Sequence, residues 1–225
     1  MKILFLIPFK SLNGGILSIF EHANRLTAMG HHVIICYPII PYRFGASWYD
    51  VKSTIWQLRG LLVNIIKWKK IDWFNLSARL LAVPWIHDHF LPQADIVVAS
   101  AWPTAYSAVK LKIKGEKFYF IQGYEIYIGP VKKIQDSYLL PLRKLVVSNY
   151  LARLLWQKFG QKSTVIPNGV NHKVFYNHRK IIHDPIRLLT YYNPVSWKGP
   201  KEVYKVFRHF ESKMQLVMFG LHIKP

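Results

Sequence analysis

The sequence predicts an α/β protein with a Rossmann-like parallel sheet and helices on both faces. Short apolar runs alternate along the chain with stretches whose apolar residues recur at helical spacing. The apolar runs are continuous, which is typical of parallel strands buried on both faces. Glycine and proline separate the runs from the helical stretches. Sheets of this kind bind ligands at the carboxyl ends of their strands.

The first strand, helix and strand are predicted from residues 1–37. The apolar run 3–7 is too short for a helix and ends at Pro8. A polar turn and the pair Gly14 and Gly15 follow, and Gly30 ends the next helix before a second strand at 32–37. One face of that helix is apolar and is formed by Ile16, Ile19, Phe20, Ala23 and Leu26.

The glycine pair at the entrance of this helix is a candidate anion site. A helix N-terminus presents unpaired backbone N–H groups and the positive end of the helix dipole, which suit a phosphate. The alternative is that Gly14 and Gly15 only ease a tight turn. The loop has neither the G-x-G-x-x-G pattern nor a Gly-Lys-Ser/Thr sequence. A dinucleotide oxidoreductase and a P-loop NTPase are therefore disfavoured.

Composition limits the class of protein. The 225 residues are 51% apolar, which is a globular composition. No stretch of about eighteen apolar residues and no signal-peptide pattern is present. The single cysteine, Cys36, lies in an apolar strand, so no internal disulfide can form and a cytoplasmic location is expected. The net charge of +20 attracts polyanions: phosphate-bearing substrates, an anionic membrane or nucleic acid.

Residues 56–70 have the pattern of a basic amphipathic helix without an acidic residue. Leu58, Leu61, Leu62, Ile65 and Ile66 form an apolar stripe. Tryptophan and basic residues accompany it: Trp56, Arg59, Lys67, Trp68, Lys69 and Lys70. Such a helix suits an anionic membrane surface, so these six residues are candidate membrane contacts. An ordinary core-facing helix with a solvated basic side is the equally weighted alternative.

The strand–helix alternation continues to residue 167. A second helix is predicted over 76–90, disturbed by Pro84, and the pair His87 and His89 at its end is not expected to bind a metal. The other predicted strands are 95–100, 118–122, 145–148 and 164–167, and the other predicted helices are 103–110 and 149–159, the latter with Ser148 as N-cap. The carboxyl ends of these strands would place residues 8–15, 100–102 and 122–125 around one cleft.

Two domains are predicted. Residues 1–170 form the first, and the polar, histidine-containing stretch 171–185 is a linker. A strand at 186–191, a helix at 200–210 and a strand at 215–219 then begin a second domain, 186–225. One such unit cannot bury both faces of a sheet, so we expect this second domain to be incomplete.

With these segments in place, the whole chain resembles the N-terminal part of a family-4 glycosyltransferase of the GT-B architecture. The opening strand, the Gly14-Gly15 pair and the helix end at 29–33 match the start of that family. Residues 119–125 resemble a segment of bacterial members that act on surface polysaccharides, including rhamnosyltransferase-like ones. Residues 148–151 and 165–171 resemble the last N-domain strand and the crossover, with Asn168 and Gly169 at the crossover. Residues 197–199 resemble the Lys-Gly turn that opens the second domain.

The resemblance implies a sugar transfer from a nucleotide-diphosphate sugar to a glycan or lipid-linked acceptor. Gly14, Gly15 and Lys198 would bind the donor diphosphate, and the lysine would neutralise the leaving phosphates. No cofactor and no metal is demanded, because helix N-termini and a lysine can carry this charge. The acceptor side would use Gln122, Glu125, Ser100 and Trp102. The alternatives are that Lys198 is a solvated turn lysine and that Gln122 and Glu125 are a polar strand end.

The sequence departs from the family pattern at three places. The segment 99–102 lacks the histidine that many members carry there, and Tyr192 replaces an arginine. The chain also ends before the paired glutamates of the donor site. No catalytic residue is therefore assigned, and we expect this polypeptide to be inactive alone. The competing function is a non-catalytic basic module that binds a membrane surface or an anionic partner. Nucleic-acid binding is disfavoured, since no nucleic-acid-binding motif is present.

Overall fold

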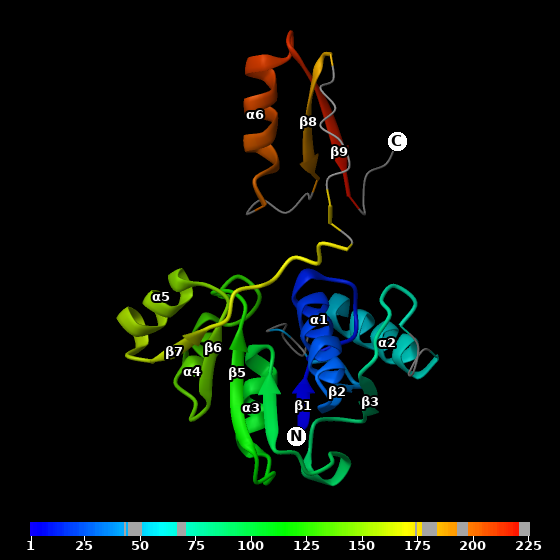
Figure 1. The fold of residues 1–225 in the computed structure, drawn as a ribbon, viewed down its shortest axis with the longest axis vertical. Coiled ribbons are helices and arrows are strands. Elements are labelled where there is room, and N and C mark those ends of the chain that lie inside the picture. Colours follow the sequence, from blue (N-terminus) through cyan, green and yellow to red (C-terminus); the bar gives the residue numbers. More distant parts are fainter. Residues whose placement is uncertain are drawn as a thin grey trace. The chain divides into compact units, whose positions relative to one another are not determined.

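The computed structural model describes residues 1–42, 44, 51–66, 71–173, 175–176, 184–192 and 198–220. The chain divides into two compact units, Met1–Gly169 and Val170–Pro225 (Figure 1). Each unit is described by itself. Part of the predicted linker 171–185 lies outside the described residues.

The first unit is built on a seven-stranded parallel sheet. Its strands are β1 (Lys2–Leu6), β2 (His32–Pro38), β3 (Arg79–Val83), β4 (Ile96–Ala99), β5 (Glu116–Ile121), β6 (Arg143–Val146) and β7 (Ser163–Val165), in the order β3-β2-β1-β4-β5-β6-β7. Every neighbouring pair is parallel. The order reverses direction at β1, between β2 and β4. Such a switch point is where open α/β sheets bind ligands.

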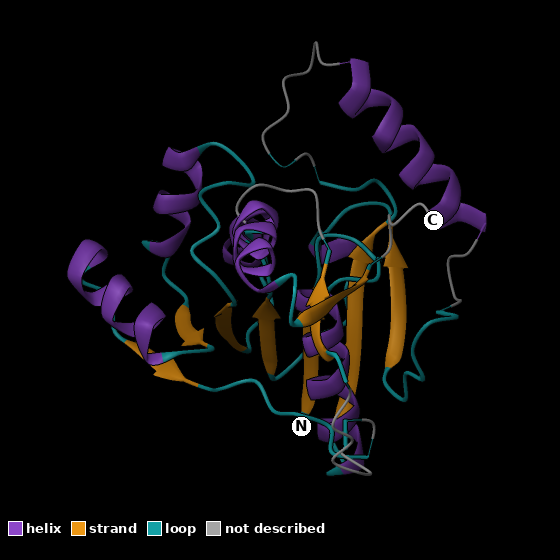
Figure 2. Cartoon of the chain, turned by 90° about the horizontal axis from the view of Figure 1, so that it is seen from above, coloured by secondary structure: helices purple, strands orange, loops and turns teal. Residues whose placement is uncertain are grey.

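Helices cover both faces of this sheet (Figures 1 and 2). On one face lies α1 (Gly14–Ala28), and on the other lie α3 (Trp102–Lys110), α4 (Val131–Tyr138) and α5 (Asn149–Phe159); the first unit also contains α2 (Val51–Ile66). In β1, alternate residues serve the two cores: Ile3 and Phe5 pack with α1, whereas Leu4 and Leu6 pack with the core that contains α3, α4 and α5. The predicted fold class, a Rossmann-like α/β sheet with helices on both faces, is confirmed.

The helix predicted over 76–90 is wrong. Arg79–Val83 instead forms β3, which pairs with β2 so that Leu81 lies opposite Cys36, and only Asp88–Phe90 forms a short 3₁₀ helix. The apolar run 80–83 is too short for a helix, and Pro84 ends it. The helix α4 was not predicted, because its sequence is largely polar and only Ile134, Ser137 and Tyr138 are buried.

Ser148 caps α5 as predicted, and its removal should be measurable. Its side chain accepts a hydrogen bond from the N–H of Leu151 at 3.3 Å. We expect Ser148→Ala to lower the free energy of unfolding by about 1 kcal/mol, because an orphan helix N–H loses its acceptor. Ser148→Asp should retain most of that stability, since aspartate is also a good cap. Urea unfolding of the three proteins is the measurement, and equal stability of the Ala and Asp variants would contradict this role.

The second unit contains the predicted strand–helix–strand sequence: β8 (Ile186–Tyr191), α6 (Pro200–Phe210) and β9 (Met214–Phe219). The two strands are parallel, with Ile186 opposite Met214. No residue of α6 is buried within the described part of the chain. Among the helices that the structure describes, none combines the length and apolarity needed to cross a membrane.

Candidate functional site

The candidate site lies where β1, β4 and β5 end. These strands are neighbours in the sheet, with Leu6 opposite Ala99 and Ala99 opposite Tyr119. The segments after them therefore meet at one edge. These segments are the predicted ones, 8–15 after β1, 100–102 after β4 and 122–125 after β5.

The loop after β1 is fixed by Asn13, which caps α1. Its Oδ1 accepts a hydrogen bond from the N–H of Ile16 at 3.0 Å, and its amide donates to the Ser11 hydroxyl at 3.2 Å. The Asn13 side chain leaves the N–H groups of the first turn at Gly14 and Gly15 to other acceptors. The sequence analysis did not assign this cap, although an asparagine directly before a helical pattern is a recognised signal for one.

Neither Gly14 nor Gly15 is required by the fold itself. Both have negative or extended φ, since positive φ occurs at Gly30, Gly160 and Gly199 among the described glycines. A Cβ added to Gly14 would meet no atom within 4 Å, and one added to Gly15 would be 3.5 Å from Gln122 Nε2. The first turn of α1 is thus open at Gly14, and an alanine could be accommodated there. Open space above main-chain amides is what a close-fitting anion needs.

Gln122 connects the end of β5 to the same turn. Its Nε2 donates to the carbonyl oxygen of Gly15 at 3.2 Å. The structure therefore brings a residue predicted for the acceptor side into contact with one predicted for the donor side. On the next turn, the Ser18 hydroxyl donates to Asn168 Oδ1 at 2.9 Å, so the predicted crossover residue also contacts α1. Gly169, its neighbour, has no atom within 4 Å of an added Cβ.

Ser100 and Trp102 are held tightly by the fold. The Ser100 hydroxyl donates to the Leu6 carbonyl at 3.0 Å, which joins β4 to β1, and its N–H donates to Thr104 Oγ1 at 3.1 Å. Trp102 is 6% exposed and packs edge-on against Phe44. Its indole Nε1 is buried without a hydrogen-bond partner in the described part of the chain. Their predicted role in acceptor binding is not tested by these contacts and stays a prediction.

Glu125 lies among tyrosines. Its backbone N–H donates to the Tyr138 hydroxyl at 3.4 Å. Tyr138 stacks between Tyr119 and Tyr124, with ring centroids 6.1 Å apart in each pair. Burial raises the pKa of the Glu125 carboxyl to about 7. Near neutral pH this group is therefore partly protonated, and it can donate as well as accept a hydrogen bond.

The tyrosine group around Glu125 was missed by the sequence analysis. Gln135 Nε2 donates to the Tyr124 hydroxyl at 2.9 Å, and the Lys158 ammonium lies 5.2 Å from the centre of the Tyr124 ring. The density of tyrosines in 119–127 was a weak signal. The remaining members come from α4 and α5, so only the fold brings them to Glu125.

Lys198 belongs to the second unit and is exposed. It precedes Gly199, the N-cap of α6, whose φ of 73° lies in the left-handed region that favours glycine. The left-handed backbone at Gly199 explains why a glycine follows Lys198 in this turn. The predicted role of Lys198 at the donor diphosphate is not tested and stays a prediction.

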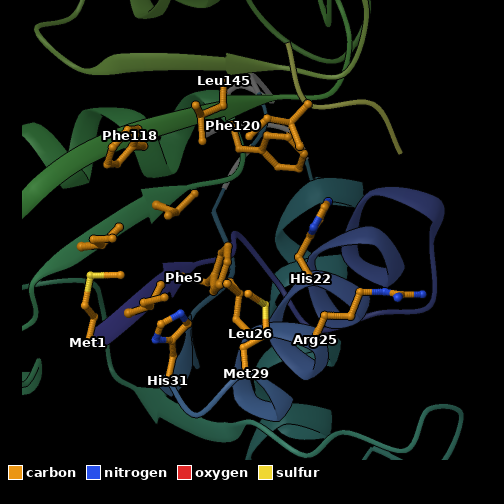
Figure 3. Close-up of a pocket in the computed structure, with 14 residues that line it drawn as sticks. Met1, Phe5, His22, Arg25, Leu26, Met29, His31, Phe118, Phe120 and Leu145 are labelled. Carbon is orange, nitrogen blue, oxygen red and sulfur yellow. The ribbon is translucent and has the colours of Figure 1, made fainter. Parts of the chain in front are cut away.

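A separate hollow lies against the sheet on the α1 side (Figure 3). It measures about 450 Å³ and is lined almost entirely by apolar side chains, including Phe5, Phe118 and Phe120. His22 and Arg25 of α1 also line it. Burial, and then the nearby Arg25 charge, lower the pKa of His22. None of the predicted donor or acceptor residues lines this hollow, and its apolar wall suits neither a phosphate nor a sugar.

The predicted membrane contacts are only partly described. Arg59 is exposed on α2. Trp56 belongs to the same helix, but its side chain lies outside the described features, and Lys67, Trp68, Lys69 and Lys70 lie outside the described residues.

The fold and this edge define an α/β protein with an open helix N-terminus at the switch point of a parallel sheet. The family model named Glycosyltransferase Family 4 matches residues 12–174, which is well over half of the chain. The protein belongs to glycosyltransferase family 4. That family assignment from the sequence is confirmed, and no curated protein matches the chain.

Solved structures support the fold. Anabaena Alr3699/HepE in complex with UDP-glucose matches with a TM-score of 0.59 and 10% identity, over 97% of this chain and 60% of that one. The same protein in complex with UDP and glucose matches with a TM-score of 0.55 and 11% identity, over 98% of this chain and 62% of that one. Sucrose-phosphate synthase from Thermosynechococcus elongatus matches with a TM-score of 0.52 and 9% identity, over 96% of this chain and 70% of that one. The chain thus spans about 60% of the length of the Anabaena protein.

Proposed function

We propose that this chain is the acceptor-side part of a glycosyltransferase that uses a nucleotide-diphosphate sugar. Membership of glycosyltransferase family 4 supports the reaction class. Two solved structures with a similar fold were determined with UDP-glucose or with UDP and glucose, which supports a nucleotide sugar as donor. The acceptor in this proposal is a glycan or a lipid-linked sugar of a surface polysaccharide, as in rhamnosyltransferase-like enzymes, and the reaction takes place in the cytoplasm.

The observation that carries the proposal is the open first turn of α1. The N–H groups at Gly14 and Gly15 lie at the switch point of the sheet, and apart from neighbouring residues and the helix's own backbone no atom of the described residues lies within 4 Å of a Cβ position at Gly14. In the proposed reaction these amides stabilise the charge on the diphosphate as the sugar–phosphate bond breaks. Lys198 adds a flexible cation to the same leaving group.

On the acceptor side, Gln122 and Glu125 have complementary roles. Gln122 is already attached to Gly15 and would place an acceptor hydroxyl beside the diphosphate. Glu125, with a pKa of about 7, can hydrogen-bond a sugar hydroxyl as donor or acceptor. Trp102 and Ser100 would shape the same edge from the segment after β4.

A nucleotide titration tests the proposal directly. We expect UDP, added to the ¹⁵N-labelled full chain, to shift the backbone amide signals of Gly14 and Gly15. Gly14→Glu should weaken this binding at least about tenfold, because a carboxylate would occupy the space above the amides and repel the diphosphate. ADP and GDP, titrated in parallel, would reveal a preference for the base.

The matched control is Met29→Glu, which puts the same charge on the exposed C-terminal end of the same helix. It should bind UDP like the unmodified chain. UDP-induced shifts that avoid Gly14 and Gly15, or equal binding by the Gly14→Glu variant, would contradict the diphosphate site.

A further inference from the structure

The apolar stripe of α2 faces away from the protein. Its described aliphatic residues recur at helical spacing, and their exposed fractions range from 53% to 77%. They are Ile55, Leu58, Leu62, Ile65 and Ile66, whereas Leu61, which the sequence placed in the stripe, is half-buried. The sequence left two interpretations of this helix open, a core-facing helix and a surface-binding one. The exposure of the stripe excludes the core-facing interpretation for these residues.

The opposite side of α2 makes the contact with the rest of the first unit. Gln57 Nε2 donates to the Pro41 carbonyl at 2.9 Å, and a Cβ on Gly60 would lie 3.0 Å from Pro41 Cγ. Leu61, on this side, is half-buried. Two contacts of the helix are thus made by a polar and a small residue, and the helix lies at the periphery of its unit (Figure 2). This arrangement is the reverse of an ordinary amphipathic helix on a globular core.

The charges along this segment have one sign. Between Asp50 and Asp72 the sequence contains no acidic residue, whereas it contains Lys52, Arg59, Lys67, Lys69 and Lys70. Arg59 is exposed and follows Leu58 of the stripe directly. A surface that covers this helix must therefore offer apolar material to the stripe and negative charge beside it.

We propose that α2 binds the surface of an anionic lipid bilayer, with its stripe inserted between lipid headgroups and its axis in the membrane plane. A bilayer supplies both required features together, acyl chains for the aliphatic side chains and anionic headgroups for the basic ones. The helix has 16 residues, too few to span the hydrocarbon core. The net charge of +20 favours an anionic surface for the whole chain. The inference does not depend on sugar transfer, because vesicle binding needs no donor.

Vesicle sedimentation with the full chain tests this assignment. We expect the protein to sediment with vesicles of phosphatidylcholine and phosphatidylglycerol, and much less with phosphatidylcholine alone. The double variant Leu58→Ser/Leu62→Ser should bind the anionic vesicles at least about tenfold more weakly, since it removes two inserted leucines. Both side chains are exposed, so urea unfolding should show unchanged stability. The control is Leu139→Ser, a leucine that is 53% exposed outside α2, which should bind normally.

Charge and oligomeric state complete the test. Reversal of Arg59, Lys67, Lys69 and Lys70 to glutamate should weaken binding more than tenfold, and added salt should weaken binding by the unmodified chain. The proposal is overturned if the unmodified chain ignores anionic vesicles or if the double leucine variant binds them equally. It is also overturned if sedimentation equilibrium finds a dimer that the leucine substitutions convert to a monomer, because the stripe then binds a second copy. Loss of UDP binding with vesicle binding intact would count against the transferase alone.

Discussion

Glu125→Gln is expected to stabilise the protein at about pH 8 and to leave its stability nearly unchanged at about pH 4. Burial raises the pKa of this carboxyl in the folded protein from 4.5 to about 7. Between pH 4.5 and about pH 7, the carboxyl is therefore protonated in the folded state and ionised in the unfolded state. Stability contributed by the neutral carboxyl is present below pH 4.5 and is lost as the pH rises through 7. The full difference corresponds to up to about 3 kcal/mol.

The measurement is the free energy of unfolding in urea at both pH values, for the unmodified chain and for Glu125→Gln. Glutamine has nearly the same shape without the charge. The free energy of unfolding of the variant should therefore decrease less between the two pH values than that of the unmodified chain. Glu116→Gln is the control, because Glu116 is an exposed partner of Arg143 at 2.8 Å and such surface pairs contribute little. A Glu125→Gln variant that is less stable at about pH 8 would mean that the carboxylate is well solvated or paired.

A carboxyl whose pKa is raised by burial is costly to ionise, and its presence fits the proposed acceptor role. Its environment could not be predicted from the sequence. The residues 122–125 were identified as a strand end on the basis of the local pattern. The tyrosines that bury Glu125 include Tyr138, which comes from the unpredicted helix α4 and lies 13 positions away in the chain. Burial of a side chain is a tertiary property, and local pattern does not encode it.

The elements that were predicted well share strong local signals. β8, α5 and α6 have the predicted bounds, and α5 has a serine cap and a glycine C-cap with φ of 63°. β3 was not predicted, because its short apolar run lies within residues 76–90, which were interpreted as one helix. For α2, the period predicted the stripe but not its direction. In the structure, Gln57 of this helix contacts Pro41, and periodicity carries no information about such a contact.

At the candidate site, the sequence predicted which segments lie at the same edge of the sheet, but not the hydrogen bonds between them. The rule for parallel sheets placed the segments after β1, β4 and β5 at one edge, and the strand order confirms this. Gln122 and Gly15 are 107 positions apart in the chain, so no local sequence pattern predicts the hydrogen bond between them. The roles of Gly14, Gly15 and Lys198 with a nucleotide sugar stay predictions until a titration is done.

Gly115→Ala is expected to destabilise the first unit by about 3 kcal/mol, because the added methyl group would meet backbone rather than flexible side chains. A Cβ at this position would overlap the Ala94 carbonyl oxygen and would lie 2.5 Å from the Asp95 carbonyl oxygen. These backbone oxygen atoms cannot easily move away from an added methyl group. Asp95 is held by Lys2, whose N–H donates to its carboxylate at 2.7 Å, and its own N–H donates to the Lys2 carbonyl at 2.9 Å.

Gly115 also adjoins the hydrogen bond with which the pairing of β4 and β5 begins, and these strands lead to the candidate site. The N–H of Glu116 donates to the Asp95 carbonyl at 2.9 Å, and Ile96 then lies opposite Glu116. This register brings the ends of β4 and β5, and with them Ser100 and Gln122, to the same edge. Urea unfolding compares Gly115→Ala with Gly14→Ala, whose Cβ meets nothing and which should be neutral or stabilising by about 0.5–1 kcal/mol as a helical alanine. Equal stability of the two variants would show that the segment before β5 can move, and that the register is fixed elsewhere in the sheet.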